Sequence, residues 1–181
     1  LTVFWGPMMG LLLFAFYVSL TSIGQEGSAF LNLQVVPLKI KEIVKAKLSI
    51  PIIASVSIMS VVVLLIQIIV QTRLEVIIAI AVALYAIILE CSFVGLAIGS
   101  RFPDFSEVPR ARFIGQKGVW LGFLMIGVCI AITILPLFLY SLGIWSFSIL
   151  ITPIPTTIAG FSICYFAYHQ IIDNVHKLTS E

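Results

Sequence analysis

The chain has 181 residues, of which 61% are hydrophobic and only 10% are charged, and its formal net charge is +2 at pH 7. Soluble domains have about a quarter of their residues charged, so this composition excludes an ordinary soluble domain and predicts a membrane protein. The small positive charge gives no reason to expect nucleic acid as a partner.

Five long apolar runs follow one another along the chain. A helix of about 20 apolar residues matches the hydrocarbon core of a bilayer, which is about 30 Å thick. The runs are continuous rather than alternating, which excludes the strands of a membrane barrel. We therefore predict an all-α, polytopic membrane helical bundle, with a single transmembrane domain over residues 1–181 and spans at about 4–23, 48–71, 76–99, 119–140 and 148–170.

The start of the chain also carries information. The first run begins within four residues of Leu1, and it lacks the basic flank and small-residue cleavage site of a signal peptide. We therefore expect the chain to be part of a longer permease or a similar membrane protein.

The basic residues predict the orientation of the bundle. If the chain enters the membrane from outside, nine of its ten basic residues fall in cytoplasmic segments and only Arg73 falls outside. Cytoplasmic segments are enriched in Lys and Arg, so we place the long loops 24–47 and 100–118 and the C-terminal end in the cytoplasm, with the N-terminal end outside. The expected location is the cell (plasma) membrane. The nine residues are Lys39, Lys41, Lys45, Lys47, Arg101, Arg110, Arg112, Lys117 and Lys177.

The first long loop concentrates the charge that the rest of the chain avoids. Ser28 can cap a short helix, which Pro37 must end because proline lacks a backbone donor. From Leu38 a second, amphipathic helix is expected, with Lys41 and Lys45 on its wetter face. Its apolar stripe consists of Ile40, Ile43, Val44 and Leu48. Two such helices along the membrane surface would offer a docking element, and the alternative is a solvated loop.

Two motifs carry a resemblance to a known family. The first loop has the Glu-Gly pair 26–27, an apolar stretch, Pro37, and the Ala-Lys pair 46–47 where the next span begins. The second loop has Gly99 followed by "FPDF" at 102–105. In this order and topology the motifs resemble those of the type 2 membrane subunits of ATP-binding-cassette exporters. The chain would then correspond to spans two to six of one six-span unit.

The resemblance implies a division of labour. In this family the short helix of the loop is a coupling helix, seated in a nucleotide-binding ATPase subunit at the cytoplasmic face. ATP and Mg²⁺ would be held by that partner, and a second permease half or a homodimer would complete the pathway among membrane lipids. The residues that the resemblance assigns to partner coupling are Glu26, Gly27, Ser28, Phe30, Leu33, Pro37, Lys41, Lys45 and Lys47.

The chain itself offers no site for nucleotide chemistry. A phosphate loop of the form G-x-x-x-x-G-K-[ST] is absent from the sequence, and "GQKGVW" at 115–120 lacks its spacing. We therefore predict that the chain is not an enzyme and binds no cofactor or metal. The cysteines Cys91, Cys129 and Cys164 stand one to a span, as small apolar residues of a bundle do.

Two polar features lie inside the predicted spans. Glu90 stands about 13 Å from the cytoplasmic end of its helix, where an acidic or basic residue costs about 2.5 to 3.5 kcal/mol unless it faces protein or water. It is either a functional group, as a polar contact in the translocation path or a coupling site to the partner half, or a protonated carboxyl. The protonated carboxyl would be bonded to a hydroxyl such as that of Ser92 or to one on a neighbouring helix. Pro153 and Pro155 predict a bend in the outer third of the fifth span, either a gate or an ordinary kink. Nearby hydroxyls that can satisfy the freed carbonyls belong to Thr152, Thr156 and Thr157.

Two other functional classes stay open. The chain could belong to an ion-coupled secondary transporter, in which Glu90 carries the coupling proton, or to a non-transporting membrane scaffold. The spacing of the Glu-Gly pair, Pro37 and Lys47 favours the exporter, because neither alternative requires a proline-terminated helix in that loop. The sequence does not indicate a substrate.

Overall fold

The computed structural model describes residues 2–27, 39–105, 113–144 and 149–180, with only the backbone described at 2–7, 150, 179 and 180. This part of the chain is helical, as predicted, and its one pairing of extended backbone is the isolated bridge between Pro103 and Ile114. The elements are α1 (Thr2–Thr21), α2 (Ile40–Val70), α3 (Leu74–Arg101), α4 (Gln116–Ser141), the short 3-10 turn η2 (Ile149–Ile151) and α5 (Pro153–Ser180).

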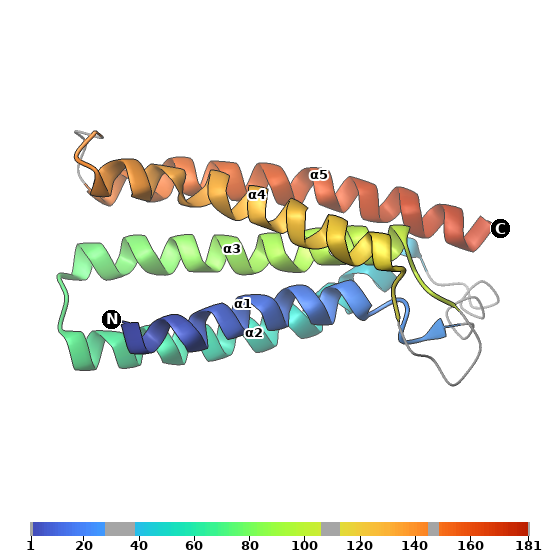
Figure 1. The fold of residues 1–181 in the computed structure, drawn as a ribbon, viewed down its shortest axis with the longest axis horizontal. Coiled ribbons are helices and arrows are strands. Elements are labelled where there is room, and N and C mark those ends of the chain that lie inside the picture. Colours follow the sequence, from blue (N-terminus) through green and yellow to red (C-terminus); the bar gives the residue numbers. More distant parts are fainter. Residues whose placement is uncertain (1, 28–38, 106–112, 145–148, 181) are drawn as a thin grey trace.

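Helix α3 is the centre of the bundle. It lies between α1 and α2 on one side and α4 and α5 on the other (Figure 1), and it contacts all four. Half of its most apolar 18-residue stretch is buried, against 17% for α2 and 28% for α4. A side chain on α3 is therefore more often enclosed by protein than one on α2 or α4.

Glycine lets α1 and α3 approach closely. Gly95 and Gly99 are one turn apart on α3, and a Cβ atom added to them would lie 2.7 Å from the carbonyl oxygen of Phe16 and 2.1 Å from that of Leu20. No side chain fits in that space. The Gly-x-x-x-Gly spacing therefore brings two helix backbones together, a common packing device in membrane helices.

The amphipathic segment of the first loop is the first part of α2 and runs into the second span, as predicted. Part of its apolar stripe is buried in a cluster, where Ile43, Val44 and Leu48 meet Ile171 and Val175 of α5. Lys41 and Lys45 are exposed, as predicted. Whether this segment lies along a membrane surface stays a prediction.

Helix boundaries differ from the predicted spans mainly in α2 and α5. Helix α2 has 31 residues because the segment from Ile40 and the second span form one helix with Pro51 inside it. Helix α5 begins at Pro153 rather than at residue 148, and it continues ten residues past the predicted end at 170. The apolar runs predict the part of a helix that lies in lipid. The helix itself can extend beyond that part as long as packing and hydrogen bonds favour it.

Three helices of the described chain, α2, α3 and α4, are long and apolar enough to cross a membrane. The described apolar stretch of α1, Met8–Thr21, is shorter. Large apolar side chains of α2 and α4, such as Ile53, Leu64 and Leu124, are exposed, as suits contact with lipid rather than with water. Membrane association is therefore supported, and a count of five spans stays a prediction.

The helix ends that the two long connections join lie at one end of the bundle. There α1 and α3 end, α2 and α4 begin, and α5 ends, while at the other end α2 and α4 end and α3 and α5 begin (Figure 1). We call the first the loop end. Which end faces the cytoplasm stays a prediction.

Candidate functional site

Of the residues predicted to couple to a partner, those that the structure describes lie at the loop end. Ser28, Phe30, Leu33 and Pro37 are outside the described residues, and so is the predicted coupling helix. The other members of the predicted set are described: Glu26, Gly27, Lys41, Lys45 and Lys47.

An ion pair joins the two ends of the first loop. The ammonium group of Lys47, in α2, contacts the carboxylate of Glu26, which follows the end of α1. The same ammonium donates a hydrogen bond to the carbonyl of Ser22, at 2.9 Å. The Lys47 side chain is 18% exposed and that of Glu26 is 41% exposed, so the lysine is the more enclosed partner. The resemblance pointed to both residues but did not indicate that they pair.

The two long loops also contact each other. A Cβ atom on Gly24 would lie 1.8 Å from the carbonyl oxygen of Phe113, so only glycine permits this approach. Phe113 belongs to a short paired segment in which the amides of Asp104 and Gly115 donate to the carbonyls of Phe113 and Phe102, both at 3.1 Å. Movement of either loop must therefore affect the other.

Asn174 fastens α5 to the end of α3. Its side-chain amide donates to the carbonyl of Ala97 and to the hydroxyl of Ser100, both at 3.1 Å. Beside it lies a polar hollow of about 460 Å³. Asn174 was not among the predicted site residues, because this residue follows the predicted end of the fifth span at 170. The lining residues of the hollow are Ser100, Arg101, Gln170, Asp173, Asn174, Lys177 and Leu178.

Glu90 lies at the point where α3, α4 and α5 meet. The residue is completely buried, so it faces protein, as predicted. One carboxyl oxygen accepts a hydrogen bond from the hydroxyl of Thr133 on α4. Ser92 is not the partner, since its hydroxyl donates to the carbonyl of Ile88 at 2.9 Å. The second oxygen of Glu90 has no hydrogen-bond partner among the described residues.

Small residues separate Glu90 from the surface of the bundle. A Cβ atom on Gly160 of α5 would lie 3.1 Å from the bonded carboxyl oxygen and 3.2 Å from the Cβ of Ala86. Both residues line an apolar groove of about 250 Å³ between α3 and α5. We call it the α3–α5 groove, and its lining residues are Val82, Tyr85, Ala86, Leu89, Thr157, Gly160 and Phe161.

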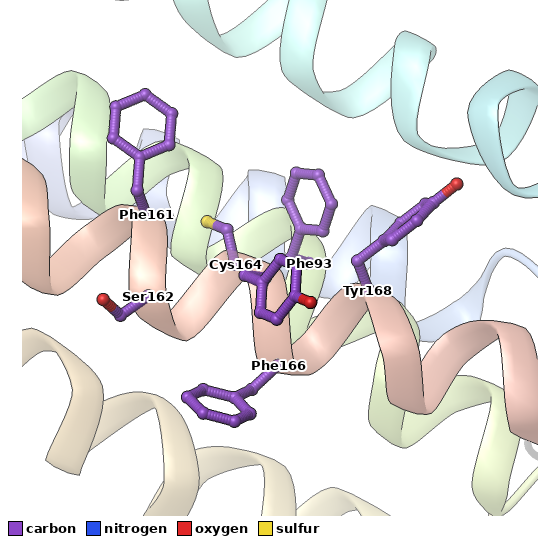
Figure 2. A pocket seen from close by; sticks show the side chains of 7 residues that line it. Phe93, Phe161, Ser162, Cys164, Phe166 and Tyr168 are labelled. Atoms are coloured by element: carbon purple, nitrogen blue, oxygen red, sulfur yellow. The ribbon is translucent and has the colours of Figure 1, made fainter.

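A second hollow, of about 550 Å³, shares one lining residue with this groove, Phe161. Figure 2 shows Phe161, Cys164 and Tyr168 of α5 on the same side as Phe93 of α3. Aromatic rings form most of its wall, so it suits an apolar ligand better than a polar one. The lining residues are Phe93, Phe161, Ser162, Cys164, Tyr165, Phe166 and Tyr168.

Each of the three helices that meet at Glu90 carries one buried cysteine. Cys91, Cys129 and Cys164 come from α3, α4 and α5, and all three are free. No group of three or more His, Cys, Asp or Glu side chains in the described segments is placed to hold a metal ion.

The predicted bend at Pro153 and Pro155 is a helix start. Pro153 is the first residue of α5 and Pro155 is in its first turn, where the missing amide donor costs no helical hydrogen bond. The threonines do satisfy backbone carbonyls as predicted. The hydroxyl of Thr156 donates to the carbonyl of Thr152 at 2.9 Å, and that of Thr157 donates to Ile154 at 2.8 Å.

Comparison with known proteins adds no relative to this picture. No protein-family model matches the chain, and no match was found among curated proteins or among solved structures.

Proposed function

We propose that the chain is the membrane-spanning permease part of an ATP-driven exporter. A separate nucleotide-binding subunit would hold ATP and Mg²⁺ at the loop end, and its hydrolysis cycle would drive alternating access. The supporting observation is the attachment of the first loop to α2 through the pair of Lys47 and Glu26. The exporter class itself is proposed from the motifs of the two long loops and from their order, which resemble those of exporter membrane subunits.

Helix α2 is suited to carry movement from a partner into the membrane. At about 1.5 Å per residue, its 31 residues span about 46 Å, more than the hydrocarbon thickness. The lysine lies near its loop end, and buried apolar residues of α2 continue to Ile66 near the other end. A push on the loop would therefore tilt the helix as a unit.

The second loop would move with the first. Gly24 lies against Phe113, and the short paired segment leads directly into α4 at Gln116. A partner docked at the loop end would therefore act on both sides of the central helix. A second permease half or a homodimer would complete the pathway, in the plasma membrane with the loop end in the cytoplasm.

The test uses the full-length protein and candidate soluble ATPase subunits that carry a phosphate loop. We expect the permease to capture one such subunit and to export substrate in proteoliposomes on addition of ATP and Mg²⁺. Lys47→Ala should uncouple ATP hydrolysis from export, whereas Arg73→Ala, at the opposite end, should not. Failure to capture any ATPase subunit would remove the main support for the proposal.

A second candidate function is supported by Glu90. A buried carboxyl with one unpartnered oxygen is also what an ion-coupled secondary transporter needs for a coupling proton. The two functions differ in their energy source. Transport driven by a proton gradient without ATP, and abolished by Glu90→Gln, would favour the secondary transporter.

A further inference from the structure

We propose that Glu90 and the α3–α5 groove form a binding site for an amphipathic primary amine, with its ammonium group at the carboxylate and its hydrocarbon chain in the groove. The inference rests on the proposed transport function, for which it names a substrate class. The binding itself needs neither ATP nor a partner subunit, so the two can be tested separately.

Among the described residues, no basic side chain forms an ion pair with the carboxyl of Glu90. Every basic residue of α3, α4 and α5 stands toward the loop end, and Arg101 is eleven positions from Glu90, or about 16 Å along the helix. Helix α1 has no basic residue at all. The basic residues in question are Arg101, Lys117, His169, His176 and Lys177.

The hydrogen bonds of the carboxyl are also incomplete. An ionised carboxyl has two acceptor oxygens, and in the described chain only the oxygen bonded to Thr133 has a donor. An unpartnered buried carboxyl oxygen is costly in a low-dielectric site. An ammonium group has three N–H donors and a positive charge. It can therefore donate a hydrogen bond to the carboxyl and neutralise its negative charge.

Gly160 links the groove with this carboxyl. Gly160 and Ala86 line the groove, and a Cβ atom on Gly160 would lie 3.1 Å from the carboxyl oxygen that is bonded to Thr133. Neither Gly160 nor Ala86 has a side chain larger than a methyl group. A small separation of α5 from α3 at Gly160 is therefore enough to open a path from the groove to the carboxyl. Substitution of Gly160 by any larger residue would place atoms in that path.

The groove accepts hydrocarbon rather than a polar molecule. Its lining is almost entirely apolar, with Tyr85 and Thr157 as the residues that carry hydroxyls. Phe161 also lines the larger aromatic hollow, so apolar surface is present on both sides of this ring. One carboxyl beside an extended apolar groove fits a single-chain amine better than a sugar, a nucleotide or an anion.

The experiment measures binding of dodecylamine to the full-length protein in zwitterionic lipid nanodiscs, without nucleotide. Dodecanol, which has the same chain length and no charge, is the matched probe. We expect saturable dodecylamine binding that Glu90→Gln weakens by about tenfold to a hundredfold, as for the loss of a hydrogen bond to a charged group. Gly160→Ala should also weaken binding, because the new methyl group would lie 3.1 Å from the carboxyl oxygen.

Gly127→Ala is the control variant, since a Cβ atom on Gly127 has no neighbour within 4 Å. It should bind dodecylamine as the unchanged protein does. Unchanged affinity in both Glu90→Gln and Gly160→Ala, or equal binding of dodecanol, would overturn the proposed site. If Glu90→Gln does not fold, the Gly160→Ala result decides. If the protein exports substrate with ATP but binds dodecylamine and dodecanol equally, the amine site is overturned and the exporter proposal stands. If it binds dodecylamine specifically but shows no ATP-driven export, the result counts against the exporter alone.

Discussion

Lys47 pairs with Glu26 across 21 positions of the sequence, and the same ammonium group also holds the carbonyl of Ser22. The contact joins the end of one helix to the first turns of the next, and both residues belong to the set that the family resemblance assigned to partner coupling. It therefore connects the proposed docking region with the helix that would transmit its movement.

The two partners of this contact should contribute differently to stability. Glu26→Gln should change the free energy of unfolding by less than about 1 kcal/mol, because half-exposed ion pairs are weak. Lys47→Met should cost about 1 to 2 kcal/mol, because it also removes the hydrogen bond to Ser22. Thermal unfolding in detergent checks both values. Equal costs for the two variants would show that the backbone contact contributes nothing.

Gly99 should be among the least replaceable residues of the chain. An added Cβ atom would lie 2.1 Å from the carbonyl oxygen of Leu20, which belongs to a helix backbone and cannot move aside. We expect Gly99→Ala to destabilise the protein by about 3 kcal/mol, at the upper end of the cost of overpacking. Gly10→Ala is the matched control on α1, where the new atom meets nothing within 4 Å. Similar melting temperatures for the two variants would contradict the close approach of α1 and α3.

Thr133 should support Glu90 through its hydroxyl. Thr133→Val keeps the shape but removes the donor, so the whole carboxyl is left without a described partner. The expected cost is about 1 to 3 kcal/mol in the free energy of unfolding, whereas Thr133→Ser should cost less. In the double variant with Glu90→Leu, which removes the acceptor, the two effects should not add, because the residues share one interaction. Additive unfolding free energies would refute the pairing.

Asn174 should hold the ends of α3 and α5 together. Asn174→Ala removes both hydrogen bonds to α3, and we expect a loss of about 1 to 2 kcal/mol. Hydrogen exchange of the amides near Ser100 should become faster. Asp173→Ala is the neighbouring control, because Asp173 is exposed. Unchanged exchange near Ser100 in the Asn174 variant would mean that other contacts fix this end.

Pro153 should be dispensable for folding. Because it begins α5, Pro153→Ala should change stability by less than about 1 kcal/mol, mostly through the unfolded chain. Export by the full-length protein tests the gating role. If the variant exports at the normal rate, the first turn of α5 is not a proline-dependent gate.

The contacts around Glu90 show where prediction from the sequence stops. Its position in a membrane helix predicted a residue that faces protein or water, since lipid excludes charge. The sequence left two kinds of hydroxyl partner open, Ser92 on the same helix or a hydroxyl on a neighbouring helix. Ser92 is not the partner, because its hydroxyl donates to the Ile88 carbonyl one turn earlier. The actual donor, Thr133, is 43 positions away and meets Glu90 only through the packing of α4 on α3.

The sequence by itself determined the helical class, the apolar segments and the asymmetry of charge between the two ends of the bundle. Each of these depends on composition over about 20 residues and on the cost of burying polar backbone in lipid. The tertiary structure decided that α3 is central, that the amphipathic stripe meets α5, and that Glu26 meets Lys47. Those outcomes depend on which helix surfaces pack best against one another in the whole bundle. A local sequence pattern describes one helix at a time, so it cannot compare the possible pairings of helices.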